Sequence, residues 1–84
     1  MSNIRKFGSK NMTEMTVGTK KVLFSYKTPV VIFDGENHFI TSERFSTTTT
    51  RQINFYLREV QASEVSTLSP DLFQKLGKKL GLIS

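Results

Sequence analysis

The sequence predicts a small α+β domain in which an antiparallel sheet of about three strands, with a hairpin at Asp34-Gly35, is followed by two helices. Apolar residues alternate with other residues from Val22 onward, which is the period of a β-strand. The Asp34-Gly35 dipeptide then separates two apolar runs, as the turn of a hairpin does. Two later segments carry apolar residues at helical spacing, each behind Ser or Thr residues that can cap a helix.

The composition fits a single small domain, which we assign to residues 1–84. The chain has 12 Lys and Arg against 7 Asp and Glu, which gives a net charge of +5. It has no cysteine, so disulfides, thiolate metal sites and cysteine catalysis are excluded. No apolar run approaches the roughly 18 residues of a membrane span, and residues 1–6 are not followed by the apolar core of a signal peptide. We therefore expect no membrane partner.

The N-terminal segment is polar and weakly patterned. We predict that residues 1–19 form a mobile or weakly structured arm and that residues 20–84 form the α+β core. Within the arm, Met12, Met15 and Val17 are placed to add an edge strand.

The core is expected to open with three strands. Val22, Phe24 and Tyr26 define the first strand by their alternation. Pro29 has no amide donor, so it must begin the second strand or lie at a bulge. The third strand returns from the hairpin turn at residues 38–41, which have the same strand-forming composition.

The first helix is expected at about residues 49–61, behind a run of four threonines. One of Ser46, Thr47 or Thr48 would be the N-cap, because a hydroxyl there accepts from an unpaired amide of the first turn. Residues 62–68 are expected to be a connection. The apolar stripe of this helix follows the spacing i, i+3, i+4 and i+7 and consists of Ile53, Tyr56, Leu57 and Val60.

The second helix has clear start and stop signals. Ser69 would be its N-cap, Pro70 its first residue and Asp71 the charge that complements the helix dipole. Gly81 is placed to be the left-handed residue after its end. Gly77 lies inside the helix, where it weakens helix formation by about 1 kcal/mol relative to alanine. The expected buried stripe is Leu72, Phe73, Leu76 and Leu80.

Two segments resemble known proteins. Residues 24–30, Phe-Ser-Tyr-Lys-Thr-Pro-Val, and residues 45–54, Phe-Ser-Thr-Thr-Thr-Thr-Arg-Gln-Ile-Asn, resemble a strand and a helix start in a family of small proteins encoded by tailed bacteriophages and prophages. The chain has Phe45 and Gln52 where those proteins commonly have Trp and His. The resemblance covers roughly residues 20–76. It implies a viral origin and a location in the host cytoplasm, and it supplies no reaction and no catalytic residue.

No residue pattern points to catalysis, a metal or a cofactor. His38 is the single histidine, and no orienting partner or nucleophile for it can be identified. Asp34, Glu36 and Glu43 are better explained by turn formation and solvation than by a catalytic carboxylate pair. The twelve-position ligand pattern of a calcium loop is absent around the turn. We therefore expect a protein that is not an enzyme and that has no cofactor and no metal site.

The most informative surface feature is the side of the first helix opposite its apolar stripe. Arg51, Phe55 and Arg58 project there. An aromatic ring between two arginines fits three roles: a platform on which a nucleic-acid base stacks, a contact with a second copy or another protein, or packing within the chain. Capping explains the threonine run before it, and anion binding at the helix N-terminus is the alternative.

These observations lead to one main hypothesis about function. We expect a small phage accessory protein, without enzymatic activity, that binds nucleic acid, either DNA or RNA, through nonspecific backbone contacts. A net charge of +5 also serves solubility, so the positions of the charges matter more than their number. The assigned residues are Arg51, Arg58, Phe55, Lys20, Lys21, Lys75, Lys78 and Lys79.

The alternative hypothesis is a protein-interaction module, such as an inhibitor of a host enzyme or a small virion or assembly component. Its partner would be a host or phage protein, with Phe55 and Phe73 as the anchors. A homodimer is expected under both hypotheses, because so small a domain gains stability from an interface.

Overall fold

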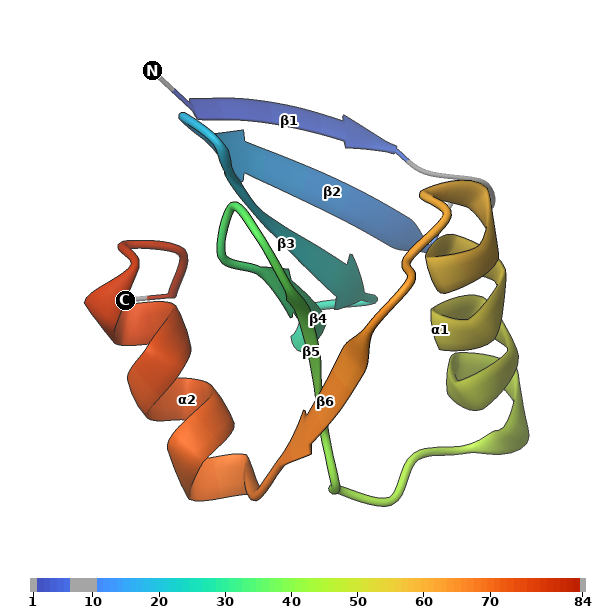
Figure 1. Ribbon diagram of the computed structural model, residues 1–84. Coiled ribbons are helices and arrows are strands. Elements are labelled where there is room, and N and C mark those ends of the chain that lie inside the picture. The colour runs from blue at the N-terminus through green and yellow to red at the C-terminus, as the bar shows by residue number, and fades with distance from the viewer. Residues whose placement is uncertain (1, 7–10, 84) are drawn as a thin grey trace.

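The computed structural model describes residues 2–6 and 11–83 and shows a three-layer α+β arrangement (Figure 1). A central sheet separates two helices, one on each side. In chain order the elements are β1 (Ser2–Lys6), β2 (Met12–Val17), β3 (Lys20–Ser25), β4 (Thr28–Phe33), β5 (His38–Thr41), α1 (Thr47–Glu59), β6 (Val65–Leu68) and α2 (Pro70–Lys79). No helix among these residues is long and apolar enough to cross a lipid bilayer.

The sheet has six strands in the order β1-β2-β3-β4-β5-β6. All neighbouring strands are antiparallel except β5 and β6, which are parallel. The α+β class is therefore confirmed, but the expectations of about three strands and of a purely antiparallel sheet were wrong. A parallel pair needs a crossover connection, and α1 is that connection between β5 and β6. The connection expected at residues 62–68 ends in β6.

The N-terminal arm predicted for residues 1–19 is also corrected where the structure describes it. Ser2–Lys6 and Met12–Val17 are strands, and β2 lies between β1 and β3 rather than at an edge. In β2, Met12 lies on the α1 side of the sheet and Met15 on the α2 side. Apolar residues on both faces hide the two-residue alternation that identifies a strand. Residues 7–10 of the predicted arm lie outside the described part of the chain.

The predicted hairpin is confirmed. The Asp34 side chain accepts hydrogen bonds from the backbone N–H groups of Glu36 and Asn37, at 2.8 and 2.7 Å, and Gly35 has φ +105°. These bonds close the turn between β4 and β5. Pro29 is the second residue of β4 and lies opposite Phe24, next to a shift in the β3–β4 register. Its place near a strand start and beside a bulge is the one its missing amide allows.

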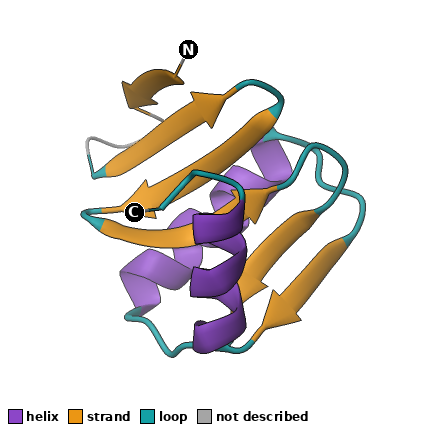
Figure 2. Ribbon diagram, turned by 90° about the vertical axis from the view of Figure 1, so that its left-hand side faces the viewer, coloured by secondary structure: helices purple, strands orange, loops and turns teal. Residues whose placement is uncertain are grey.

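The two helices cover opposite faces of the sheet (Figure 2). Adjacent strand residues point to opposite faces, so Leu23 packs under α1 while Val22 packs under α2. The α1 layer is built on Met12, Leu23, Val30, Val31, Ile53 and Tyr56. The α2 layer is built on Val22, Ile32, Phe73 and Leu82, with several half-buried residues around them.

Both helices have an N-cap that the sequence predicted, but α1 covers Thr47–Glu59 rather than about residues 49–61. Ser46 caps α1 by accepting from the Thr49 N–H, and Ser69 caps α2 by accepting from the Leu72 N–H. The predicted apolar stripe of α1 faces the sheet, with Ile53 and Tyr56 buried and its other two members packed against them. In α2, however, Leu72 is 54% exposed, so its assignment to the buried stripe was wrong.

After α2 the chain turns back, and its last described residues pack against the helix at Gly77. Gly81 has φ +75°, the left-handed conformation predicted for it. The N–H groups of Leu82 and Ile83 both donate to the Gly77 carbonyl, at 2.8 and 3.1 Å. A Cβ on Gly77 would lie 2.7 Å from Cγ1 of Ile83, so the glycine makes room for this return.

Candidate nucleic-acid interface

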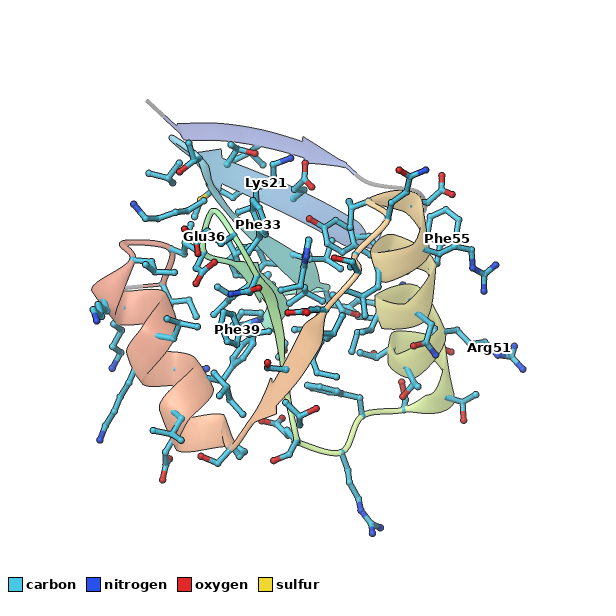
Figure 3. The ribbon with its side chains drawn as sticks, viewed as in Figure 1. Lys21, Phe33, Glu36, Phe39, Arg51 and Phe55 are labelled. Atoms are coloured by element: carbon cyan, nitrogen blue, oxygen red, sulfur yellow. The ribbon has the colours of Figure 1, made fainter. Side chains whose placement is uncertain are left out.

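The predicted stripe on α1 lies on its solvent side. Arg51, Phe55 and Arg58 are all exposed, and Phe55 keeps 40% of its surface accessible. Figure 3 shows Arg51 and Phe55 directed away from the sheet. The prediction that these three residues share the outer face of the helix is confirmed.

The spacing of the two arginines suits a phosphate backbone. Seven residues of α-helix rise about 10.5 Å, which is close to the axial rise of three nucleotides, about 3.4 Å each, in one strand of a B-form duplex. The first turn of α1 has no acidic residue, and Glu59 is the single acid of the helix. Among the described residues, neither arginine forms an ion pair. Both arginines are exposed to solvent.

A buried polar cluster holds the N-terminal half of α1 against β3. Thr49 and Gln52 are buried on the inner face of the helix, where they meet the buried Ser25. The Ser25 hydroxyl donates to Oε1 of Gln52 at 2.5 Å and lies 3.3 Å from the Thr49 hydroxyl. The capping residue Ser46 joins the same cluster, because its hydroxyl donates to the Thr49 hydroxyl at 3.3 Å.

A second buried contact holds the next turn of α1. The Tyr56 hydroxyl donates to Oε2 of Glu14 at 2.7 Å, and both residues are almost fully buried. Hydrogen bonds are directional, unlike apolar contacts, so these contacts set the rotation of α1 about its own axis. The buried contacts of Gln52 and Tyr56 therefore fix the direction in which Arg51, Phe55 and Arg58 point.

The polar inner residues were not predicted. Thr49, Gln52 and Tyr56 follow the spacing i, i+3 and i+7, so a helical wheel places the two polar residues beside the apolar stripe. Their partners Glu14 and Ser25 come from strands far away in the sequence. The wheel could have indicated their burial, but local sequence does not reveal the partners.

The predicted lysines do not join this stripe. Lys75, Lys78 and Lys79 are exposed on α2, on the opposite side of the sheet from α1. Lys20 and Lys21 are neighbours in β3, so their side chains point to opposite faces. The eight assigned residues thus fall into separate groups, and one short ligand cannot contact them all.

His38 has an environment that the sequence did not suggest. Its ring lies against Phe33, its cross-strand neighbour, with 4.6 Å between the ring centres. Partial burial lowers the pKa of His38 from its ordinary value of 6.5, the positive charge of Lys21 lowers it further, and Asp34 opposes both effects. The hydrogen bond from the Asn37 N–H lowers the pKa of Asp34. No group of three His, Asp or Glu residues suited to a metal occurs in the described chain.

The anchor role proposed for Phe73 under the protein-interaction hypothesis is wrong. Phe73 is 1% exposed and belongs to the core between α2 and the sheet. In the threonine run, Thr49 is buried in the cap cluster, whereas Thr47, Thr48 and Thr50 are exposed. The capping hydroxyl belongs to Ser46, so capping accounts for none of the four threonine hydroxyls; that of Thr49 accepts a hydrogen bond from Ser46.

The fold and this surface define a small three-layer α+β protein with a basic, aromatic stripe on one helix. The chain belongs to a family of unknown function, DUF8033, whose pattern matches residues 1–74. Searches among curated proteins and among solved structures found no significant match.

Proposed function

We propose that this protein binds nucleic acid without sequence preference, as a nonenzymatic accessory protein, through the outer face of α1. The observation that carries the proposal is the exposed Arg51, Phe55 and Arg58 stripe on a helix whose rotation is set by buried hydrogen bonds. A bacteriophage setting, which the sequence resemblance implies, would make DNA and RNA abundant ligands for such a protein.

The three side chains make different contacts with the nucleic acid. Arg51 and Arg58 contact phosphates, which gives affinity without reading sequence. Phe55 stacks on a base, and stacking on an aromatic residue contributes about 1 to 3 kcal/mol per base. Bases in a duplex are already stacked on each other, so we expect single strands to bind more tightly than duplexes.

The test is a binding titration with a fluorescent single-stranded oligonucleotide over a range of salt concentrations. Removing two phosphate contacts lowers the slope of log K against log salt by about 1.4 for a single strand. We expect the Arg51→Ala/Arg58→Ala variant to show this loss, together with weaker binding. Phe55→Ala should lower affinity for single strands by about 5- to 150-fold, from the stacking energy above, and leave the salt slope unchanged.

The matched control is Lys75→Ala/Lys78→Ala on α2. It removes the same two positive charges from exposed helix positions on the other side of the sheet. We expect it to bind almost as the unchanged protein does. Equal losses in the two double variants would show that net charge alone attracts the ligand, and the proposed interface would then be rejected.

A further inference from the structure

Strand β6 forms an open edge of the sheet (Figure 2). Within the described chain its ladder partner is β5 alone, and Val65, Ser66 and Thr67 are all exposed. Val65 is 40% exposed, so an apolar side chain lies at this edge as well as backbone.

The backbone groups that face outward can be identified. The N–H and C=O of one strand residue point to the same side, and successive residues alternate between sides. The Leu68 carbonyl accepts from the Ser42 N–H at 2.7 Å, so Leu68 and Ser66 direct their backbone groups toward β5. Val65 and Thr67 therefore direct theirs away from the sheet, which leaves two donors and two acceptors at the edge.

β6 is a short edge strand of four residues, but it lacks the other usual kinds of protection against pairing. Proteins also block open edges with lysines, prolines, bulges or a covering segment. β6 has the sequence Val-Ser-Thr-Leu, without charge or proline, and its register with β5 is regular. Each chain carries a net charge of +5, but β6 itself has no charged residue. Pairing of two β6 strands therefore places no like charges opposite each other within the strands.

We propose that β6 pairs with β6 of a second copy of this chain, antiparallel and across a two-fold axis at Ser66. In this register Val65 of one copy lies opposite Thr67 of the other, and both pairs of outward-facing residues exchange two hydrogen bonds. Val65 and Thr67 are β-branched residues on the same face, which is a favourable cross-strand combination. Ser66 lies opposite Ser66 of the second copy, on the α2 side of the sheet.

The symmetry has a consequence for the stripe on α1. A two-fold axis between antiparallel edge strands is perpendicular to the sheet, so the α1 helices of both copies lie on the same face. From the strand spacing, we place the two helices on the order of 30 Å apart. If the proposed function holds, the dimer presents two stripes to one nucleic-acid strand, which raises its affinity by effective concentration. The pairing itself does not depend on that function.

Cysteine crosslinking tests the pairing without nucleic acid. The chain has no cysteine, so each variant carries a single thiol. Facing residues of a non-hydrogen-bonded antiparallel pair have Cα atoms about 4.5 Å apart, within the range of a disulfide. Ser66→Cys should therefore form a disulfide dimer under mild oxidation at moderate salt.

Val65→Cys is the matched control. Its Cα atom lies about 8 to 9 Å from that of the same residue in the second copy, too far for a disulfide. We expect at least tenfold more crosslinked dimer for Ser66→Cys than for Val65→Cys. Equal crosslinking, crosslinking of Val65→Cys alone, or no crosslinking would overturn the proposed pairing.

Sedimentation of two further variants provides an independent test. Thr67→Pro removes one outward N–H and leaves the β5 side of the ladder intact, whereas Thr67→Ala keeps that N–H. We expect Thr67→Ala to dimerise and folded Thr67→Pro to remain monomeric. A dimer that persists in folded Thr67→Pro would refute the pairing; if that variant does not fold, the cysteine pair decides. If the unchanged chain sediments as a monomer, the pairing is refuted, whereas oligonucleotide binding by that monomer would still support the proposed function.

Discussion

Tyr56→Phe isolates the hydrogen bond between α1 and β2. The substitution keeps the buried ring and removes only the hydroxyl that donates to Glu14 at 2.7 Å. A buried carboxyl then loses a donor, and leaving a buried acceptor without its hydrogen bond costs about 1 to 3 kcal/mol. We expect the free energy of unfolding to fall by about 2 kcal/mol, which corresponds to a Tm lower by about 8 to 16 °C for a domain of this size.

The chain supplies its own control, because it has two tyrosines. Tyr26 is 59% exposed, so Tyr26→Phe should change stability by no more than about 0.5 kcal/mol. Urea unfolding followed by far-ultraviolet circular dichroism suits both variants, because the chain has no tryptophan and each variant alters tyrosine fluorescence. If Tyr56→Phe were as mild as Tyr26→Phe, the contact would not hold α1 to the sheet.

A double-mutant cycle with Glu14→Gln assigns the loss to this pair. Glutamine keeps a side-chain oxygen that can accept from Tyr56 but replaces the carboxyl group by an amide. The cost of Tyr56→Phe should therefore be smaller in the Glu14→Gln background, with a coupling of about 1 kcal/mol. Additive effects would refute the expected coupling, because they would mean that the hydrogen bond from Tyr56 is as strong to an amide oxygen as to the Glu14 carboxyl.

Two further predictions concern α2 and the hairpin. Helix propensity alone favours Gly77→Ala by about 1 kcal/mol, but the new Cβ meets Ile83, and overpacking costs about 1 to 3 kcal/mol. We expect net destabilisation by urea unfolding, and stabilisation by the same substitution in an Ile83→Ala background; a stabilising Gly77→Ala alone would refute the contact. For His38, the pKa is lowered on folding, so the unfolded chain binds a proton more readily. The free energy of unfolding should fall as the pH decreases below about 6.5, and His38→Gln should weaken this dependence; NMR titration of the single histidine must give a pKa below 6.5.

The parts of the fold that local chemistry specifies were predictable. Ser46 and Ser69 cap the helices as their positions indicated, and Asp34 closes the hairpin turn with its side chain. Pro29 restricted the start of β4 because it has no amide hydrogen. Each of these features depends on residues within a few positions along the chain.

The remaining strands depend on contacts that local pattern does not carry. β6 is an exposed edge strand whose middle residues, Ser66 and Thr67, need no apolar alternation. β2 has apolar residues on both faces because a helix covers each side. The stripe of Arg51, Phe55 and Arg58, in contrast, could be predicted from a helical wheel, because all three residues belong to one helix. Its separation from the α2 lysines follows from the placement of α2 on the other face.

The buried inner face of α1 determines where its exposed outer face points. An apolar inner face alone would bury equal area over a range of rotations, because hydrophobic contact has no preferred direction. Gln52 bonded to Ser25, and Tyr56 bonded to Glu14, each satisfy a buried polar group in one orientation only. Rotating the helix by one residue, about 100°, would break both contacts and turn both arginines together by the same angle, away from the direction that they have here. The buried polar residues thus restrict where the basic stripe can point.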